Sequence, residues 1–337
     1  MKNVLVLSGT ASAINYIKSF ANDPDIRLHI TDADPYCPGL YAPGVTPHVV
    51  PRARDTMRYR ASLDRLLVEH AIDVLIPTSD YDIEGVVHYL KDGWVPNVAM
   101  FRPPFNAFAV LGNKGRLMAY LAQRLPSVVP QTWIGVERVR QLAFPVVIKP
   151  AGESGGKDVT IVRYHDDFAA AVERIRALYG DEFLVQQFIP GNTYIVSMIY
   201  DHDGRLVIGV PMRSHLTFFT WGGGGCAGEV VDEPGLVRLC AEVAEAAGGW
   251  SGPINFEWRK HAETGAFYLM EANCRLNGYS YLTTMNGVCL PHIVLALLTG
   301  APLPAVAPPA RRNRNFVLGF RETPVDRWVD HAERIVA

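Results

Sequence analysis

Residues 253–278, PINFEWRKHAETGAFYLMEANCRLNG, decide the fold. Within them, residues 253–259 and 266–272 are two short runs rich in apolar and aromatic side chains, and a Glu-Thr-Gly segment at 263–265 separates them. Strand-forming runs on either side of a short glycine-containing segment are typical of a β-hairpin. The stretch therefore predicts two antiparallel strands joined by a tight turn.

The predicted hairpin carries three oxygen-bearing side chains. Glu257 falls in its first strand, and Glu271 and Asn273 are two residues apart in the second, so they share a face. Mg²⁺ prefers such hard oxygen ligands and is usually shared between one or two protein carboxylates and the phosphates of a nucleotide. The three side chains are a candidate magnesium site, and the alternative is a hairpin with polar residues on its solvent face.

The bulk composition describes an ordinary globular chain that can bury a large core. Its 337 residues are 49% hydrophobic and 20% charged, a length that predicts two or three domains. A net charge of −2 argues against a general binder of nucleic acid or membrane surfaces. We expect no signal peptide, no membrane span and no zinc or disulfide framework, since the five cysteines lack CxxC spacing. A cytoplasmic location fits these features best.

The first third of the chain alternates apolar strands with amphipathic helices. Strands are expected within 4–9, 27–35 and 73–80, with helices at 13–21 and 57–69. This order predicts a doubly wound parallel sheet, whose ligands lie at the carboxyl ends of the strands. Polar residues fall at those ends: Asp32, Asp34, Thr78, Ser79 and Asp80. The first loop lacks GxGxxG, so a nicotinamide-binding interpretation has weak support.

A domain boundary is expected near residue 110, and a helix at 112–124 follows it with Asn113 as N-cap and Lys114 in the first turn. A strand at 142–149, a glycine-rich loop at 152–157 and a strand at 159–163 come next. Such a loop can fold over phosphates because glycines let backbone N–H groups approach closely. It lacks P-loop spacing, and the alternative is a tight hairpin turn.

Further elements are predicted along the rest of the chain: a helix at 166–179, strands at 183–189, 194–200 and 206–211, and helices at 235–247 and 290–298. The Asp203-Gly204 pair between two of these strands is a strong hairpin signal. The glycine run at 222–225 is expected to be a mobile surface loop. The segment after Pro302 is rich in proline and arginine and is expected to be loosely attached.

Taken in order, these features resemble the ATP-grasp superfamily, and most of all its carbamoyl-phosphate-synthase-like carboxylate–amine ligases. The most specific parts are FPVVIKPAGESGGKDV at 144–159, LVQQFIPG at 184–191, and FEWR with MEANCRLNG in the hairpin. The resemblance covers about residues 1 to 300 and rests on their combined order and spacing.

The resemblance implies a fold class of mixed α/β and α+β type. Residues 1–110 would form a Rossmann-like parallel-sheet domain that precedes the grasp fold. Residues 111–188 would form the small ATP-grasp subdomain with its glycine loop, and 189–305 the C-terminal subdomain that binds metal and substrate. Residues 306–337 would be a tail.

The resemblance also implies roles for individual residues. Two lysines would hold the nucleotide's phosphates, the glycine loop would close over them, and the segment after it would contact adenine. The implied nucleotide-binding residues are Lys114, Lys149, Gly152, Ser154, Gly155, Gly156, Lys157, Gln186, Gln187, Phe188, Ile189 and Thr193. The implied metal ligands are Glu257, Glu271 and Asn273, and the implied catalytic residues are Arg275, Arg213 and Lys157. The family often places an acidic ribose ligand where this chain has Asn192-Thr193.

The implied reaction is ATP-dependent ligation of a small, amino-acid-like carboxylic acid to an amine. The acid would attack the γ-phosphate to give an acyl phosphate and ADP, and the amine would then displace phosphate. The implied cofactors are ATP and Mg²⁺, with Mn²⁺ as a substitute, and a homodimer is compatible with the resemblance. Two alternatives stay open: transfer of the acyl phosphate to a nonamine nucleophile, and a nucleotide-binding module without catalysis. Asp80, Glu84 and His215 are weaker candidates for substrate contact.

Overall fold

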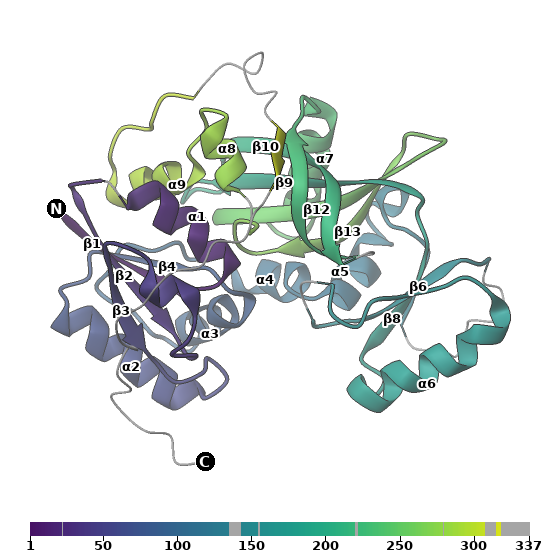
Figure 1. The fold of residues 1–337 in the computed structure, drawn as a ribbon, viewed down its shortest axis with the longest axis horizontal. Coiled ribbons are helices and arrows are strands. Elements are labelled where there is room, and N and C mark those ends of the chain that lie inside the picture. Colours follow the sequence, from purple (N-terminus) through teal and green to yellow (C-terminus); the bar gives the residue numbers. More distant parts are fainter. Residues whose placement is uncertain are drawn as a thin grey trace.

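Three β-sheets organise the protein (Figure 1). The computed structural model describes residues 1–21, 23–134, 143–153, 156–219, 222–278, 280–306 and 315–317. A parallel sheet forms the N-terminal part, a small antiparallel sheet follows it, and a six-stranded antiparallel sheet forms the C-terminal part. Among the described residues, no helix has both the length and the apolar character needed to cross a lipid bilayer.

The N-terminal sheet has the strand order β3-β2-β1-β4, and all of its neighbouring strands are parallel. Its strands are β1 (Lys2–Leu7), β2 (Ile26–Asp32), β3 (Val45–Val49) and β4 (Val74–Pro77). Its helices are α1 (Ala11–Phe20), α2 (Thr56–Glu69) and α3 (Asp80–Lys91). Strand β1 is buried on both faces over its last four residues, as expected for a parallel sheet covered by helices. The predicted doubly wound sheet is thus confirmed.

The small sheet has the order β5-β8-β6-β7 and is antiparallel throughout. Its strands are β5 (Thr132–Ile134), β6 (Val146–Pro150), β7 (Thr160–Val162) and β8 (Phe183–Gln187). Helix α6 (Phe168–Tyr179) packs on the sheet through Val172 and Ile175, and together they form the unit at the right of Figure 1. The strands on either side of the predicted glycine loop are therefore paired neighbours.

The large sheet has the order β13-β12-β9-β10-β11-β14. Its strands are β9 (Gly191–Tyr200), β10 (Leu206–Phe219), β11 (Gly222–Val230), β12 (Gly252–His261), β13 (Phe267–Asn273) and β14 (Asn315–Val317). The helices around it are α4 (Phe105–Leu111), α5 (Lys114–Leu121), α7 (Pro234–Ala246), α8 (Tyr281–Met285) and α9 (Leu290–Thr299). Short 3-10 helices at Pro38–Tyr41, Pro126–Val128 and His165–Asp167 complete the described elements.

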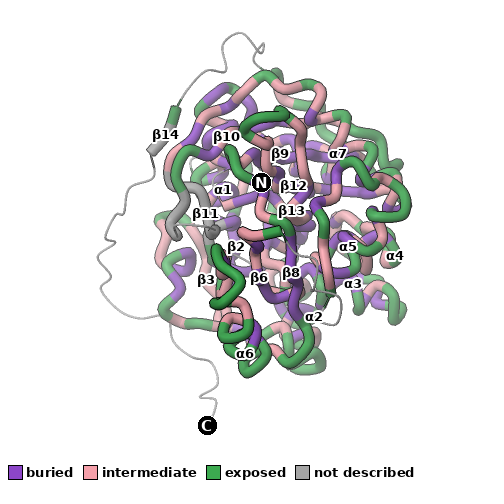
Figure 2. Tube along the Cα trace, turned by 90° about the vertical axis from the view of Figure 1, so that its right-hand side faces the viewer, coloured by how far each residue is buried: buried purple, intermediate pink, exposed green. Residues whose placement is uncertain are grey.

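Strand β9 separates two hydrophobic cores, and it is buried along most of its length (Figure 2). Ile195 and Ile199 point to the side where α1, α8 and α9 fill the space between the large sheet and the parallel sheet. Val196 and Met198 alternate with them and face α4, α5 and α7. Because both faces are covered, the large sheet is fixed against the N-terminal sheet and can present residues to a shared site.

The sequence predicted the central hairpins correctly. Strands β12 and β13 pair in the expected antiparallel way, and β9 and β10 pair on either side of the predicted turn. Gly204 in that turn has φ +79°, a left-handed conformation that glycine adopts without steric cost. The N-cap assignment is also confirmed, because Asn113 Oδ1 accepts a hydrogen bond from the Arg116 backbone N–H at 3.0 Å.

One expectation about an irregular segment was wrong. The glycine run at 222–225 lies in strand β11, which pairs with β10 through several register shifts, and is not a loop. Backbone hydrogen bonding places these residues in a sheet although glycine has low strand propensity. Most of the predicted tail lies outside the described residues, and its described part, β14, pairs with β11 at the edge of the large sheet.

Candidate active site

The two hairpin glutamates lie directly opposite each other. Glu257 on β12 pairs in register with Glu271 on β13, and Asn255 pairs with Asn273 in the same way. Residues two apart on a strand share a face, so all four side chains project from one side of the hairpin. Asn273 donates from Nδ2 to Glu271 Oε1 at 3.2 Å. The structure thus brings together the three side chains predicted to bind metal.

Lys114 completes this cluster from the neighbouring helix. The Asn113 cap starts α5 at Lys114, and its Nζ lies 2.7 Å from Glu271 Oε2. Both side chains are 14% exposed, so the pair is shielded from water. Lys114 also donates to the backbone carbonyl of Glu153 in the glycine-rich segment. One ammonium group therefore ties α5 to both the hairpin and the phosphate-loop candidate.

The electrostatics of the glutamate pair are asymmetric. Burial, together with the charge of Glu271, raises the pKa of Glu257 to about 8. Burial acts on Glu271 in the same direction, but the Lys114 charge outweighs it and lowers the pKa of Glu271 to about 2. Two adjacent buried carboxylates repel each other, so only one of them ionises easily until more positive charge is bound. The cluster therefore favours the arrival of a further cation.

Lys149 approaches the cluster from the small sheet. It is the second-last residue of β6, is 7% exposed, and donates from Nζ to the Met270 backbone carbonyl at 3.3 Å. Burial lowers its pKa to about 8, with a further contribution from Lys114. Lys114 and Lys149 thus place two ammonium groups beside the two glutamates, in a chain whose net charge is −2.

A cavity of about 170 Å³ lies between the small sheet and the hairpin. Its lining includes most of the residues that the resemblance assigned to the nucleotide, together with two of the predicted metal ligands. These are Lys114, Lys149, Gly156, Lys157, Gln186, Gln187, Phe188, Ile189, Thr193, Glu257 and Glu271. Gly152 is described but does not line this cavity, and Ser154 and Gly155 lie outside the described residues.

The far end of this cavity is less charged. Gln186 is 1% exposed and donates from Nε2 to Thr132 Oγ1 at 2.8 Å, which fixes its amide plane. Thr193 accepts a hydrogen bond from Arg259 Nη1 at 3.2 Å, and that arginine also donates to the Ile189 carbonyl at 3.1 Å. Apolar walls with a few fixed polar groups suit a planar heterocycle.

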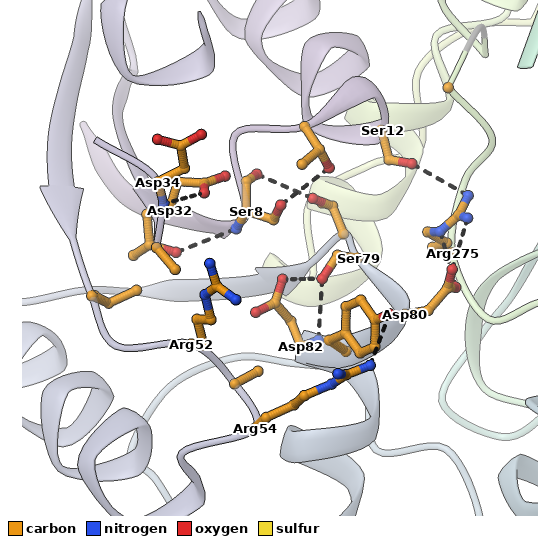
Figure 3. A pocket seen from close by; sticks show the side chains of 18 of the residues that line it. Ser8, Ser12, Asp32, Asp34, Arg52, Arg54, Ser79, Asp80, Asp82 and Arg275 are labelled. Atoms are coloured by element: carbon orange, nitrogen blue, oxygen red, sulfur yellow. Dashed lines mark hydrogen bonds and ion pairs between the residues drawn. The ribbon is translucent and has the colours of Figure 1, made fainter. Parts of the chain in front are cut away.

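A second cavity, of about 650 Å³, opens at the carboxyl ends of the parallel strands (Figure 3). Gly156, Glu257 and Glu271 line both cavities, so the two spaces meet at the glutamate pair. Arg275 lines the second cavity and forms a two-pronged contact with Asp80, with Nε–Oδ1 at 3.0 Å and Nη2–Oδ2 at 2.9 Å. The meeting point is where a group held in one cavity can reach a group held in the other.

Polar residues of the N-terminal domain surround the rest of this second cavity. Asp32 accepts backbone N–H groups from Gly9 and Asp34, both at 2.9 Å, so its carboxylate shapes the loops. Arg54 donates to Tyr81 Oη at 3.1 Å. Arg52 lines the cavity and is exposed, and its guanidinium has no ion pair or hydrogen bond within the part of the chain that the structure describes. It is available to an anionic ligand.

Three candidates lie away from both cavities. Arg213 on β10 pairs with Glu229 on β11, and His215 Nε2 lies 3.2 Å from the same carboxylate. Neither residue lines either of the two cavities, and the exposed Glu84 on α3 does not either. The catalytic role that the resemblance implies for Arg213 stays a prediction.

Sequence reasoning missed several site residues. Asn255 is fully buried on the glutamate face of β12, and its Oδ1 has no hydrogen-bond partner within the described residues. Its spacing of two from Glu257 could have identified it. Tyr59 donates to Asp82 in the second cavity, and burial raises the pKa of Asp82 to about 6. No local motif marks that pair, because α2 and α3 bring them together.

The donor set at the hairpin fits Mg²⁺. Within the described residues, no group of three or more His, Cys, Asp and Glu side chains is placed to hold a metal. The available ligands are two carboxylates and amide oxygens, including the unpartnered Asn255 oxygen. Mg²⁺ commonly takes one or two protein carboxylates and completes its shell with water and phosphate oxygens.

Comparisons with known proteins identify the same fold. A family model described as ATP-grasp in the biosynthetic pathway with Ter operon matches residues 180–317, and an ATP-grasp domain model matches residues 142–217. The D-alanine–D-alanine ligase of Geotalea uraniireducens (strain Rf4) is 28% identical over 179 residues, which cover 48% of this chain and 56% of that ligase. The chain thus spans about half the length of this curated relative.

Two solved structures have similar folds at low sequence identity. The L-amino acid ligase from Bacillus licheniformis aligns with a TM-score of 0.67 and 16% identity, covering 88% of this chain and 74% of that one. A biotin carboxylase complex from Campylobacter jejuni aligns with a TM-score of 0.69 and 18% identity, covering 90% and 72%. Residues 142–317 thus match ATP-grasp family models, and the chain shares its fold with these solved structures.

Proposed function

We propose that this protein is an ATP-dependent carboxylate–amine ligase that forms ADP and phosphate. The observation that carries the proposal is the junction of two cavities at Glu257, Glu271 and Gly156. A nucleotide in the smaller cavity would direct its terminal phosphate to this junction, and an acid in the larger cavity would reach the same point. Similarity to ligases of alanine and other amino acids supports the assignment.

The nucleotide would lie between the small sheet and the hairpin. Gln186, held by Thr132, would present its amide to the adenine ring, and Lys114 and Lys149 would bind the phosphates as cations. Lys157 lies at the open side, 3.6 Å from Glu153 and 61% exposed, where it would follow the glycine loop onto the terminal phosphate. We assign the region before residue 110 to binding of the acid, which accepts the phosphate, and the region after it to binding of the nucleotide.

The chemical difficulty is the approach of a carboxylate to a polyanion. The chain answers it with positive charge rather than with a strong base: Lys114 and Lys149 lie at the junction, and Arg275 projects from the other side. Mg²⁺ bound by Glu257, Glu271 and Asn273 would neutralise further phosphate charge. Asp80 fixes the Arg275 guanidinium through two hydrogen bonds, so its donors are oriented before substrate arrives.

The acid would become an acyl phosphate, which an amine then attacks to form an amide and release phosphate. The larger cavity is sized for small substrates, and its free Arg52 suits a molecule with a second anionic group. Closure of the glycine loop near Gly156 would keep water from the acyl phosphate. These features favour amino-acid-like acids over large polymers.

The test is phosphate release from Mg-ATP by the purified protein in the presence of pooled amino acids, followed by mass spectrometry of active pools. The proposal predicts ADP together with a product equal in mass to two substrates minus water. Formation of ADP together with a product that contains no incorporated amine would favour a nonamine acceptor. Binding of ATP without turnover by any pool would favour a module that only binds nucleotide.

A further inference from the structure

A chain of three polar side chains links α1 to α9, outside the two cavities described above. Cys289 Sγ lies 3.0 Å from His292 Nδ1, and His292 Nε2 lies 3.2 Å from Asp23 Oδ2. Cys289 precedes α9 as its N-cap, His292 lies in α9, and Asp23 follows α1. None of the three lines either cavity. The thiol, imidazole and carboxylate are arranged in the order of a nucleophile, a base and an orienting acid.

The local sequence explains this placement. Cys289 is the N-cap of α9, and His292 follows three residues later, so both lie on one face of the helix. Helix α9 runs for ten residues, and the positive end of its dipole stabilises an anion at the N-cap position. His292 packs edge-on against the Phe20 ring with 5.1 Å between centroids, which holds the imidazole in place.

Further groups around the sulfur favour its thiolate form. Burial alone would raise the pKa of Cys289, but the contact with His292 outweighs it, and Ser19 and Thr284 add to the effect, so the pKa falls to about 7. The hydroxyl oxygens of Ser19 and Thr284 are buried, and neither forms a regular hydrogen bond with another described group. The hydrogen bond with Cys289 raises the pKa of His292, and Asp23 raises it further. A thiolate next to an imidazolium is the state that these neighbours stabilise.

Three other cysteines have the opposite environment. Cys37, Cys240 and Cys274 are buried, and burial raises the pKa of each above that of an ordinary thiol. Cys289 is partly exposed, and the side chains of His292 and Asp23 are 32% and 26% exposed. A small reagent can therefore approach Cys289 but not the three buried thiols, which serve as internal references.

We propose that Cys289, His292 and Asp23 form a site at which the Cys289 thiolate reacts with hydroperoxides. The sulfur would attack the outer peroxide oxygen, an S–O bond would form and the O–O bond would break. Sulfur is oxidised by two electrons and the peroxide is reduced to an alcohol or water. The leaving oxygen would take its proton from the His292 imidazolium, and Cys289 would become a sulfenic acid.

A hydroperoxide is the reactant favoured by this geometry because its leaving oxygen needs a proton at the moment the O–O bond breaks. His292 supplies a proton donor 3.0 Å from the sulfur, and Asp23 compensates the positive charge on the imidazole. The charged and titratable groups that face the thiol are His292 on its own helix, Asp23 after α1, and the phenol of Tyr16 on α1. The site at Cys289 and the proposed ligase reaction are independent of each other.

The experiment uses the full chain with Cys226 replaced by Ser, because the side chain of Cys226 lies outside the described residues. The pH dependence of bromobimane labelling is measured first, and labelled peptides are identified by mass spectrometry. We expect labelling at Cys289 with a midpoint near pH 7. Hydrogen peroxide with dimedone should then give a sulfenic-acid adduct at Cys289 and leave Cys37, Cys240 and Cys274 unmodified.

Two variants separate a reactive site from a merely exposed thiol. His292→Asn keeps a hydrogen-bond donor near the sulfur but cannot carry its positive charge, and Asp23→Asn keeps the size of the orienting group. We expect the labelling midpoint to rise by at least about one pH unit in His292→Asn, with a roughly tenfold slower peroxide reaction at pH 7. Asp23→Asn should also raise the labelling midpoint and slow the peroxide reaction, each by a smaller amount.

The inference is overturned if Cys289 titrates near the value of an ordinary thiol, or if both variants react with peroxide as fast as the parent. Equal dimedone labelling of a buried cysteine would also contradict it. Circular dichroism of each variant shows that the fold is retained. If His292→Asn does not fold, the Asp23→Asn variant and the parent pH profile decide the question.

Discussion

Replacing Glu257 with Gln should make the nucleotide-free protein more stable at high pH while it abolishes turnover. Glu257 lies opposite Glu271, and burial together with that neighbour raises its pKa to about 8 in the folded protein, from 4.5 in the unfolded chain. Between these values the folded state holds a proton that the unfolded state has lost. Stability therefore falls as the pH rises from 4.5 to 8, and the neutral Gln variant avoids that loss.

The size of the effect follows from the pKa change. At about 1.4 kcal/mol per pH unit, a change from 4.5 to about 8 is at most about 5 kcal/mol. Glu257 is a half-buried residue that titrates together with Glu271, which reduces this value, and we expect about 2–3 kcal/mol at pH 8.5. For a cooperative transition of 337 residues, this stabilisation corresponds to an increase in Tm of about 3–4 °C. At pH 5 the difference should nearly vanish.

The assay is thermal unfolding at pH 5 and pH 8.5 without nucleotide or Mg²⁺, combined with phosphate release at pH 8. Glu242→Gln on α7 is the matched control, since the carboxylate of that exposed residue has no ion pair or hydrogen bond within the described residues. The control should leave Tm and turnover unchanged. A Glu257→Gln variant with a lower Tm than wild type at pH 8.5 would refute the reasoning. So would a variant whose Tm differs from that of wild type by the same amount at pH 5 and pH 8.5.

Three further predictions test other parts of the structure. Lys114→Met leaves the buried Glu271 carboxylate without its cation and should lower the free energy of unfolding by about 3 kcal/mol in urea titrations; no change in the midpoint would contradict the pairing. Arg275→Lys keeps the charge but loses the two-pronged contact, and should reduce kcat about 100-fold in a phosphate-release assay, with a melting temperature near that of wild type; retained kcat would exclude the assigned role. His29 and His48 have pKa values that burial lowers to about 4, so the unfolded chain takes up protons first as the pH falls below 6.5, and stability is lost between pH 6.5 and 4. The difference in urea midpoint between wild type and a double Gln variant should therefore be smaller at pH 5 than at pH 7. An equal difference at both pH values would count against this account.

The sequence was most informative where local chemistry determines local structure. Alternation and turn residues predicted the hairpin that places Glu257 opposite Glu271, and the Asn113 cap predicted the position of Lys114. These features depend on neighbours within a few residues along the chain. They account for the glutamates and lysines at the cavity junction.

Contacts between distant segments could not be predicted in this way. Asp80 holds Arg275 across a separation of 195 residues, and no local pattern marks that partnership. The glycine run at 222–225 looked like a loop because strand propensity is low there, but pairing with β10 determines its backbone. The Cys289–Asp23 link through His292 likewise depends on the packing of α9 beside α1.

The central claim is that a carboxylate from the larger cavity receives the terminal phosphate of ATP at the glutamate junction. The most direct test supplies active amino-acid pools with ¹⁸O in their carboxyl groups, and measures the mass of the phosphate released from Mg-ATP. The account predicts phosphate that carries one ¹⁸O atom for each condensed product, because the acyl–oxygen bond breaks when the amine attacks. A condensed product formed with ADP and unlabelled phosphate would contradict it.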